Sequence, residues 1–490
     1  MNYPIVFKML SMVFGTLSIA VGACACMCAY FGNSILEQEA LPNWITCFAV
    51  CILVSVIFYI PGKSAQMKLF KREAMCVIGL SWLFTSFFGA LPYVLILNAN
   101  FADAFFESAS GFTTTGSSVF SSVENFPRSL ILWRSLSQWI GGLGVVVLFV
   151  AILSFLGASA RILYSYESSA KSYEHDSGQI RNGVFRIFAV YLFLSAACAV
   201  CYKLCGLGCF DAFCHMLTTV PSGGFGTFEQ NIGSLNNPAL EWAMIFFMFV
   251  SGVSFIYILS LLRGNFEYIK RNTEFFAYVA VLAFSTFVVF VSRENYSGFS
   301  DALANFRTSA FQCVSIMTST GYAVCDYQTW KPITHILFFV LIFIGGCSGS
   351  TSGGLKVARA VAAVKLAVAH LARSYRPRLV NPVKLNGRVL TESGSVEILT
   401  FIVLYVLAFF AGTLVISMLE PETSFEGAMS AVIASLSNVG PGFGEFGPFS
   451  DYSALSVASK LVLAFVMILG RIELYAILAL FAPSFWKTFR

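Results

Sequence analysis

The chain has 490 residues, of which 57% are hydrophobic and only 11% are charged, and its mean hydropathy is +0.78. A soluble domain carries about 25% charged residues, so most of this chain is expected to lie in a lipid bilayer. The net charge of +5 is small, and the basic residues lie in loops beside apolar segments, so a nucleic-acid partner is not expected. The longest polar stretches, Ser165–Arg186 and Ser374–Ser395, leave no room for a sizeable soluble domain.

Ten apolar segments are long enough to cross a bilayer as helices, which takes about 20 residues. The first apolar stretch, Tyr3–Phe31, is longer than the core of a signal peptide and lacks a convincing cleavage site, so we expect it to be retained. In chain order the predicted spans are Ile5–Tyr30, Trp44–Ile60, Ala74–Leu97, Leu130–Leu156, Val184–Leu204, Leu240–Leu262, Phe275–Val291, Ile333–Gly345 with its continuation, Val396–Met418 and Leu455–Leu480.

Four apolar segments between these spans are too short to cross, and each ends at a loop rich in Gly, Thr and Ser. The segments are Phe101–Thr113, Phe210–Thr219, Ala302–Met317 and Phe425–Leu436; the loops are TTTGS (Thr113–Ser117), PSGGF (Pro221–Phe225), TSTGY (Thr318–Tyr322) and SNVGP (Ser437–Pro441). Non-helical backbone at membrane depth occurs only where it is buried in protein or lines water. We therefore predict an all-α membrane protein with two leading transmembrane helices, then four pseudo-symmetric repeats of helix, pore helix, filter loop and helix around a central pore.

The repeats share residues as well as hydropathy. Asp103-Ala104-Phe105 begins thirteen residues before Gly116, and Asp211-Ala212-Phe213 begins thirteen residues before Gly224. This spacing favours Gly224 over Gly223 as the equivalent of Gly116. The expected division is residues 1–70 for the leading pair and 71–165, 166–272, 273–388 and 389–490 for the four repeats.

Positive charge predicts the orientation, since Lys and Arg are enriched in cytoplasmic loops. In the ten-span arrangement all basic groups fall on one face, which places both termini in the cytoplasm: Lys63, Lys68, Lys71, Arg72, Arg161, Lys171, Arg181, Arg186, Arg263, Lys270, Arg271, Lys365, Arg373, Arg376, Arg378, Lys384, Arg388, Lys487 and Arg490. The opposite face carries Glu124, Glu229, Asp326, Glu420, Glu422, Glu445 and Asp451. Such an acidic mouth raises the local cation concentration, although acidic residues also simply keep a loop solvated.

The four loops have the composition of a cation filter. Half-helices that end near a central axis point their partly negative C-termini at a cation, and the extended backbone beyond them offers carbonyls that replace its water. Glycine at the fourth place permits the backbone angles and close approach that this needs. A single loop would be an ordinary turn, but four matched loops favour a filter. Its predicted residues are Thr114, Thr115, Gly116, Ser222, Gly223, Gly224, Ser319, Thr320, Gly321, Asn438, Val439 and Gly440.

Nearly the whole chain resembles the TrkH/KtrB superfamily of bacterial potassium transporters, the TrkH branch in particular. The resemblance rests on Gly111–Ser118, Gln138–Leu148, Pro221–Phe228, Thr318–Tyr322, Gly345–Lys356, Ser437–Pro448 and Gly470–Tyr475. It implies potassium as the transported ion, uptake through the cytoplasmic membrane, a homodimer with one pore per subunit, and a cytosolic nucleotide-binding regulator of the TrkA type. Four filter glycines favour potassium in this superfamily, and serine at the first is associated with sodium passage. The resemblance leaves open whether transport is coupled to sodium or protons.

The span that begins at Ile333 is interrupted by the run Gly345–Gly354, which contains Gly345, Gly346, Gly349, Gly353 and Gly354. So many Gly and Ser residues do not hold a stable helix. One interpretation is a site where neighbouring helices pack closely; the resemblance implies an intramembrane loop that gates conduction below the filter. A nucleotide-binding P-loop is excluded because Leu355 stands where that motif needs Lys.

Arg471 lies inside the last apolar span, where a central arginine costs at least ~2.5–3.5 kcal/mol on insertion scales. Glu473 points elsewhere on the helix and is a poor partner. Either the arginine extends to the cytoplasmic edge, or, as the resemblance implies, it is a fixed positive charge below the filter that hinders cations until the broken segment moves. Binding to carbonyls of that segment is expected in the second case.

Other polar residues give weaker predictions. Most cysteines lie in apolar spans, as do Cys24, Cys26 and Cys28, and we expect them to be inert. The four histidines, His175, His215, His335 and His370, have no metal-ligand spacing, and His215 is expected to be packed on its half-helix. Glu107 and Glu426 lie on half-helices and either attract cations or serve as hydrogen-bonded structural carboxylates. No catalytic constellation or organic cofactor site is evident, so an enzyme is not expected; the main rival is a secondary transporter with broken helices at the midplane.

Overall fold

The computed structural model describes residues 2–32, 34–65, 71–155, 177–229, 231–293, 299–376 and 382–486. Parts of both polar stretches lie outside these residues, as do Leu156 at the end of a predicted span, His175, and the basic residues Lys68, Arg161, Lys171, Arg378, Lys487 and Arg490. The described chain is largely helical, with one two-stranded hairpin.

The helices follow one another with short connections. They are α1 (Tyr3–Tyr30), α2 (Ile35–Gly62), α3 (Lys71–Gly89), α4 (Leu91–Leu97), α5 (Phe101–Phe112), α6 (Arg128–Phe155), α8 (Ser177–Leu204), α9 (Cys209–Thr219), α10 (Pro238–Ser251), α11 (Phe255–Leu262), α12 (Phe266–Arg271), α13 (Thr273–Ser292), α14 (Phe299–Met317), α15 (Pro332–Ile344), α16 (Val357–Tyr375), α17 (Glu392–Leu419), α18 (Phe425–Leu436), α19 (Val457–Arg471), α20 (Tyr475–Phe481) and α21 (Pro483–Trp486). Strands β1 (Lys384–Leu385) and β2 (Arg388–Val389) pair antiparallel. Short 3-10 turns, η1 (Val123–Asn125), η2 (Asn231–Leu235), η3 (Tyr327–Thr329) and η4 (Gly444–Phe446), follow the four glycine loops.

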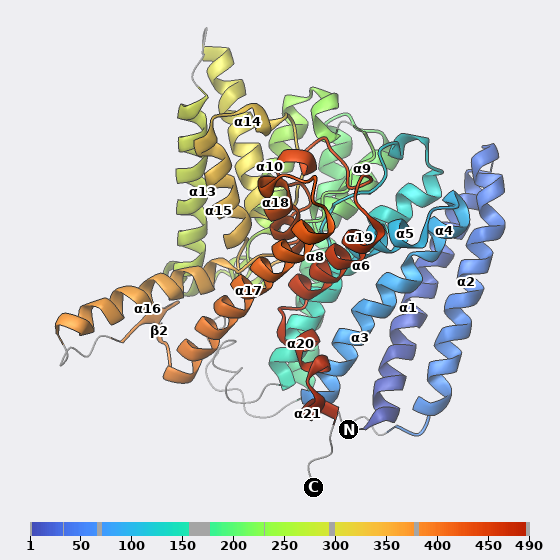
Figure 1. Ribbon diagram of the computed structural model, residues 1–490, viewed down its shortest axis with the longest axis horizontal. Helices are drawn as coiled ribbons and strands as arrows, with labels where there is room; N and C mark the ends of the chain where they lie inside the picture. Colours follow the sequence, from blue (N-terminus) through green and yellow to red (C-terminus); the bar gives the residue numbers. More distant parts are fainter. Residues whose placement is uncertain are drawn as a thin grey trace.

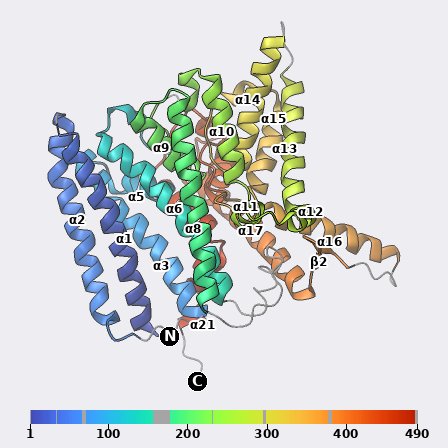
Figure 2. The same ribbon diagram turned by 180° about the vertical axis from the view of Figure 1, so that it is seen from behind.

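The long helices form a bundle with the short helices α5, α9, α14 and α18 set among them. Figures 1 and 2 show α1 and α2 side by side along one flank, next to α3, and α13 with α15 along the opposite flank. Helices α5, α9 and α14 lie in one half of the molecule, whereas α16, α20 and α21 lie in the other, where α16 runs sideways from the bundle (Figure 1). The short helices are thus enclosed by the long ones.

Local sequence explains where several of these helices begin. The side chains of Asn100 and Ser424 accept backbone N–H groups of the first turns of α5 and α18, which are the half-helices of the first and fourth repeats. Pro238 and Pro332 occupy the first turns of α10 and α15, where a missing N–H costs no hydrogen bond.

The predicted spans coincide with helices, but not all are single straight ones. Six described helices are long and apolar enough to cross a membrane, and two bent pairs raise this to eight. We expected Leu240–Leu262 and Leu455–Leu480 to be continuous, and this was wrong: α10 and α11 meet at 100°, and α19 and α20 at 119°. The first bend lies at Gly252, where a Cβ would be 2.5 Å from the Tyr278 hydroxyl.

Candidate ion-conduction site

The four glycine loops have the same backbone conformation. Their second residues have positive φ, at 54° for Thr114, 59° for Ser222, 56° for Ser319 and 54° for Asn438. The glycines at the fourth place are also positive: Gly116 at 87°, Gly224 at 80°, Gly321 at 76° and Gly440 at 99°. Positive φ is uncommon for non-glycine residues and a clear outlier for a β-branched one such as Thr114. The repetition supports the predicted alignment, with Gly224 equivalent to Gly116.

Hydrogen bonds from each loop to its own short helix repeat in the same way. The third residue of every loop donates its backbone N–H to the carbonyl five residues earlier, at distances of 2.8–2.9 Å; the pairs are Thr115 with Ser110, Gly223 with Thr218, Thr320 with Ser315, and Val439 with Ala434. These bonds use carbonyls at the helix C-terminus that have no partner within the helix. The helix end and the loop therefore form one unit in each repeat.

The four loops close into a ring. A Cβ added to Gly116 would lie 2.2 Å from the carbonyl oxygen of Gly223, and one added to Gly224 would lie 1.8 Å from that of Thr320. The same construction on Gly321 meets the oxygen of Val439 at 2.1 Å, and on Gly440 that of Thr115 at 2.7 Å. Each glycine thus packs against the third residue of the following loop, and the fourth loop returns to the first. All twelve predicted filter residues belong to this ring.

Side chains support the loops differently. The first and third loops each contain a pair of hydroxyls in contact, Thr113 with Thr115 at 2.7 Å and Thr318 with Thr320 at 2.8 Å. In the fourth loop Asn438 donates from Nδ2 to Thr115 Oγ1 at 2.9 Å. The ring is therefore regular in backbone but not in side chains.

Two carbonyls of the ring accept hydrogen bonds from side chains outside it. Gln138 of α6 donates from Nε2 to the oxygen of Gly223 at 2.8 Å. Ser117 and Tyr452 both donate to the oxygen of Gly440, each at 3.0 Å. A carbonyl has two lone pairs, so these contacts orient the oxygens without exhausting them.

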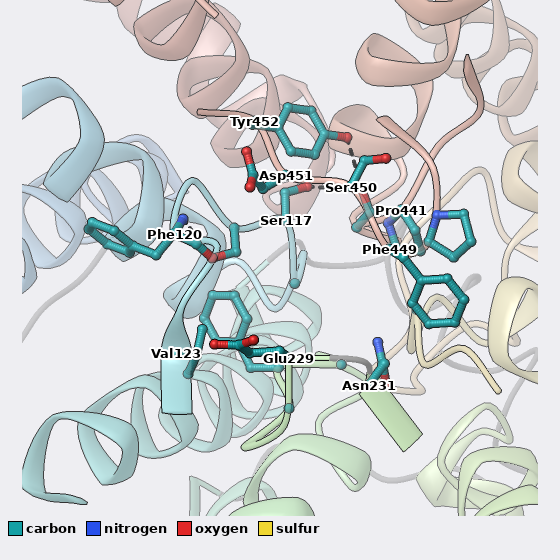
Figure 3. A pocket seen from close by; sticks show the side chains of 18 of the residues that line it. Ser117, Phe120, Val123, Glu229, Asn231, Pro441, Phe449, Ser450, Asp451 and Tyr452 are labelled. Carbon is teal, nitrogen blue, oxygen red and sulfur yellow. Dashed lines mark hydrogen bonds between the residues drawn. The ribbon is translucent and has the colours of Figure 1, made fainter. Parts of the chain in front are cut away.

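A cavity opens on one side of the ring (Figure 3). Its lining includes all four glycines of the ring together with Ser117, Glu229, Asp451 and Tyr452. Carboxylates of Glu229 and Asp451 therefore border the entrance. Glu445 lies in the same loop region: partial burial raises its pKa, but hydrogen bonds from its own backbone and from Ser424 outweigh this, so the pKa is below the usual value.

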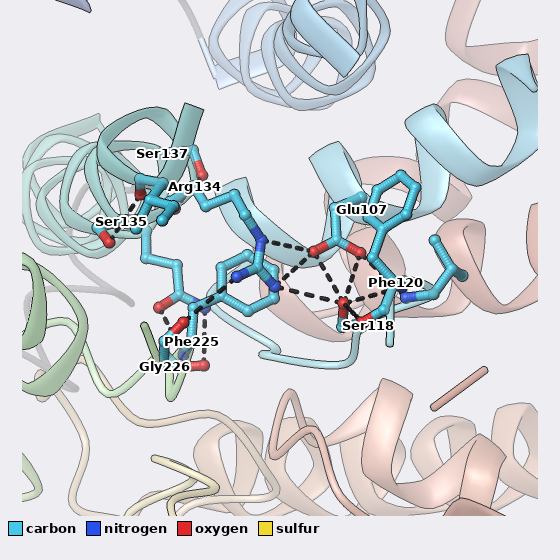
Figure 4. A network of polar contacts seen from close by, with 12 residues as sticks. Glu107, Ser118, Phe120, Arg134, Ser135, Ser137, Phe225 and Gly226 are labelled. Atoms are coloured by element: carbon cyan, nitrogen blue, oxygen red, sulfur yellow. Dashed lines mark hydrogen bonds and ion pairs between the residues drawn. The ribbon is translucent and has the colours of Figure 1, made fainter. Parts of the chain in front are cut away.

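Glu107 is a structural carboxylate rather than a free cation attractor. It is fully buried on α5 and pairs with Arg134 of α6 at 2.7 Å, and it accepts the Val119 N–H at 3.0 Å (Figure 4). The Arg134 guanidinium lies 4.1 Å from the centre of the Phe225 ring. The pair therefore links the strand leaving the first loop to the second loop. Glu426, the other carboxylate considered, is exposed in the first turn of α18.

The predicted break between Ile333 and Val368 is present, and it lies directly against the filter loops. Helix α15 ends at Ile344 and α16 begins at Val357. Between them, Thr351 Oγ1 contacts Ser222 Oγ at 2.8 Å, and the Gly353 N–H donates to Ser319 Oγ at 2.7 Å. A Cβ on Gly353 would lie 2.0 Å from the oxygen of Ser437. The segment thus touches the second, third and fourth loops.

The remaining glycines of the break allow this path. Gly345, Gly349 and Gly354 have φ of 70°, 73° and 79°. A Cβ on Gly346 would be 2.5 Å from Ser352 Oγ, whereas the carbonyl of Gly349 accepts the Phe255 N–H at 3.1 Å. Close packing and an irregular loop, the two interpretations considered, therefore occur together.

Arg471 binds the broken segment. It is the last residue of α19, is 5% exposed, and donates from Nη1 to the carbonyl oxygen of Thr351 at 2.7 Å. Its Nε and Nη2 have no partner among the described residues. Glu473 pairs instead with Arg359 of α16 at 2.6 Å, as expected for a side chain that points elsewhere. The burial of Arg471 does not fit an arginine that extends to the solvent.

Comparison with known proteins identifies the family. Residues 40–488 match the sequence model of the family TrkH, described as "Cation transport protein". The chain belongs to the TrkH family. This TrkH-family chain is 32% identical over 449 residues to the "Trk system potassium uptake protein TrkH" of Halomonas elongata, covering 91% of this chain and 92% of that protein. It is 31% identical over 452 residues to the "Trk system potassium uptake protein TrkG" of Escherichia coli K12, covering 90% and 92%.

A solved structure of the TrkH family has the same fold. The crystal structure of the potassium transporter TrkH from Vibrio parahaemolyticus superimposes with a TM-score of 0.88 at 27% identity, covering 99% of this chain and 100% of that chain. The predicted fold class and the predicted resemblance are therefore confirmed. The described part of this TrkH-family chain contains no group of three or more His, Cys, Asp or Glu residues that could hold a metal ion.

Sequence reasoning missed the residues that support the ring from outside. Arg134 and Gln138 act on the second loop, whereas Tyr452 acts on the fourth. Arg134, like Arg471, is a charge within an apolar span of this TrkH-family chain, and it could have been found by the same argument. Tyr452 lies in a polar loop and gave no signal.

Proposed function

We propose that this chain is a potassium uptake protein of a bacterial cytoplasmic membrane, the activity stated in the names of its curated relatives. The observation that carries the proposal is the closed ring, in which each glycine packs against a carbonyl of the next loop. A ring of carbonyls of this kind replaces the water of a potassium ion. The ion would bind at Thr114–Gly116, Ser222–Gly224, Ser319–Gly321 and Asn438–Gly440.

The direction of transport follows from the charge distribution. The acidic cavity bordered by Glu229 and Asp451 would face the outside and raise the local cation concentration. The short helices point their C-termini at the ring from that side. The predicted orientation, with both termini in the cytoplasm, places the broken segment and Arg471 at the inner end of the pathway.

Control would lie in the broken segment. Residues Gly345–Gly354 contact the inner ends of three filter loops, and Arg471 adds a buried positive charge bonded to Thr351. A fixed positive charge on the pathway repels cations, because Coulomb interactions are strong where water is excluded. Movement of the segment would carry the Arg471 contact away and open the pathway.

The partners follow from the family resemblance. We propose a homodimer with one pore per subunit, surrounded by lipid, and a cytosolic nucleotide-binding regulator of the TrkA type. The relatives' names contain the words "Trk system", which fits a transporter with additional components. No organic cofactor and no catalytic role are proposed.

The rival proposal is a secondary transporter that couples another substrate to sodium or protons at a midplane site. The ring favours potassium conduction because its four loops follow one another in one rotational sense, whereas an inverted repeat would not. The test is growth and potassium uptake of a bacterial strain that lacks its own potassium transporters, with and without this protein. Uptake by the purified protein in liposomes, with and without sodium, then separates simple conduction from coupled transport. Absence of potassium uptake in both assays would remove the proposal.

A further inference from the structure

Three of the four short helices carry a polar side chain nine residues before the filter glycine. These are Glu107, His215 and Gln312, and the fourth helix has Ala431 at this place. Each polar side chain contacts the strand that leaves its own loop: Glu107 accepts the Val119 N–H at 3.0 Å, His215 Nε2 contacts Thr227 Oγ1 at 3.3 Å, and Gln312 Nε2 donates to the Cys325 oxygen at 3.4 Å. The position therefore supports the outgoing strand in three repeats.

His215 differs because it also reaches a second filter loop. Its Nδ1 lies 3.2 Å from the hydroxyl of Tyr322, the residue directly after Gly321. The backbone oxygen of Tyr322 accepts the Ser315 hydroxyl at 2.6 Å, so both ends of this residue are held. This contact runs beside the place where Gly224 packs on Thr320, and it therefore joins the second and third loops behind the ring.

The hydrogen-bond inventory assigns the direction of each bond. The Thr227 hydroxyl donates its single proton to Asp211 Oδ1 at 3.0 Å, so His215 Nε2 must be the donor in its contact with Thr227. A neutral imidazole with Nε2 protonated has an acceptor at Nδ1, and the Tyr322 hydroxyl donates to it. His215 itself is fully buried, and its ring stacks on Phe228.

We propose that His215 is a positioning residue for cation selectivity: by accepting the Tyr322 hydroxyl at Nδ1, it holds the third filter loop against the second. The proposal rests on the proposed potassium filter. The contact with Thr227 is secondary, because Thr227 keeps its bond to Asp211 when the histidine is replaced. Selectivity depends on carbonyl positions, so loss of the tether should change the relative KM for potassium and sodium more than the maximal rate.

The two ring nitrogens allow a matched set of variants. In asparagine the side-chain oxygen stands as many bonds from Cα as Nδ1 does, and in glutamine the amide nitrogen corresponds to Nε2. His215→Asn therefore keeps an acceptor for Tyr322, whereas His215→Gln keeps only the donor to Thr227, and His215→Phe removes both while preserving the ring that packs on Phe228. His335→Phe is the control, since His335 contacts the Tyr327 carbonyl and none of the four filter loops.

The experiment measures KM and maximal rate for potassium, and inhibition by sodium, with the full-length protein in liposomes. His215→Phe and His215→Gln should lower the potassium-to-sodium ratio by roughly three- to tenfold, the effect of one lost hydrogen bond. His215→Asn should restore most of the ratio. Tyr322→Phe should match His215→Phe, and the double variant should add little, because both changes remove the same contact.

Several outcomes decide the matter. An unchanged ratio in both His215→Phe and Tyr322→Phe would overturn the proposal, as would a fall in maximal rate alone, since that is what a purely structural residue gives. Equal behaviour of His215→Asn and His215→Gln would also overturn it. If His215→Phe does not fold, His215→Asn, His215→Gln and Tyr322→Phe still provide the comparison. An unmodified protein without preference for potassium would instead remove the proposed function itself.

Discussion

The contacts of the four filter glycines predict unequal effects of the same substitution. We consider replacement of each glycine by serine. A real Cβ essentially never lies within 3.0 Å of another heavy atom, yet here it would meet the neighbouring carbonyl oxygen at 1.8 Å for Gly224, 2.1 Å for Gly321, 2.2 Å for Gly116 and 2.7 Å for Gly440. The neighbouring loop must therefore move by roughly 1 Å in the first three variants and by a few tenths of an ångström in the fourth.

Backbone strain adds a similar amount in every case. All four glycines have positive φ, which costs a residue with a side chain roughly 1–2 kcal/mol. The difference between the variants therefore comes from displacement of the carbonyl that coordinates the ion. Because a misplacement of about 1 Å changes a positioned interaction by up to a hundredfold, we expect the potassium-to-sodium ratio to fall by roughly ten- to a hundredfold for Gly116→Ser, Gly224→Ser and Gly321→Ser, and by less than about tenfold for Gly440→Ser.

The assay is competitive uptake of potassium and sodium into liposomes that contain each full-length variant. Gly206→Ser is the matched control, because Gly206 has φ of 102° but its Cβ would meet nothing closer than 4.0 Å. It should lose stability from backbone strain and keep its selectivity. An equal loss of selectivity in all four filter variants, or a larger loss in Gly440→Ser than in Gly224→Ser, would refute the reasoning. Retained potassium selectivity in Gly116→Ser would count against the filter as a whole.

Three further substitutions test the regions around the ring. Arg471→Ala removes the guanidinium bound to the Thr351 carbonyl, so potassium uptake into liposomes should rise or lose its regulation; an unchanged rate and response would exclude the gating role. Thr351→Val keeps the shape of the side chain but removes its contact with Ser222, and basal uptake should rise about two- to tenfold, the value of one hydrogen bond. Glu107→Gln leaves Arg134 buried without its carboxylate and should destabilise the protein by about 3–5 kcal/mol in thermal inactivation. Adding Arg134→Met should recover part of that loss; no recovery would mean that the pair does more than neutralise charge.

The fold could be predicted from the sequence to the extent that hydrophobic length and repetition specify it. Helix positions follow from the need to satisfy every backbone group in lipid, and the loops stood out because Gly, Thr and Ser interrupt that pattern. The alignment of Gly224 with Gly116 needed only the spacing from Asp103 and Asp211, and the φ values of both loops support it. Arg471 was found because a charge in an apolar span is costly.

Bends and cross-chain supports could not be predicted in the same way. The bend after α19 passes through Glu473 and Leu474 at φ of 56° and 62°, conformations that neither residue prefers and that tertiary contacts must impose. The ion pair of Glu473 with Arg359 joins positions 114 residues apart, and no periodicity links them. Hydropathy reports how apolar a segment is, whereas a bend depends on what the segment meets.

The contacts below the ring divide the filter into two parts. The broken segment contacts the second loop at Ser222, the third at Ser319 and the fourth at Ser437. In the first loop the corresponding hydroxyl, Thr114 Oγ1, is buried without a hydrogen-bond partner among the described residues. The first loop is instead fixed from the other side, where the strand that leaves it is held by the buried pair of Glu107 and Arg134.

Movement of the broken segment would therefore remove support from three loops and leave the first unchanged. Because each glycine of the ring packs on the next loop, a shift in the second, third or fourth loop changes the spacing at its neighbours. Gate and filter are in direct contact in this arrangement, so opening the pathway should alter the ring that selects the ion. The selectivity of the open state, measured in Arg471→Ala, should then fall below that of the regulated protein, and equal selectivity would show that the ring is held without the segment.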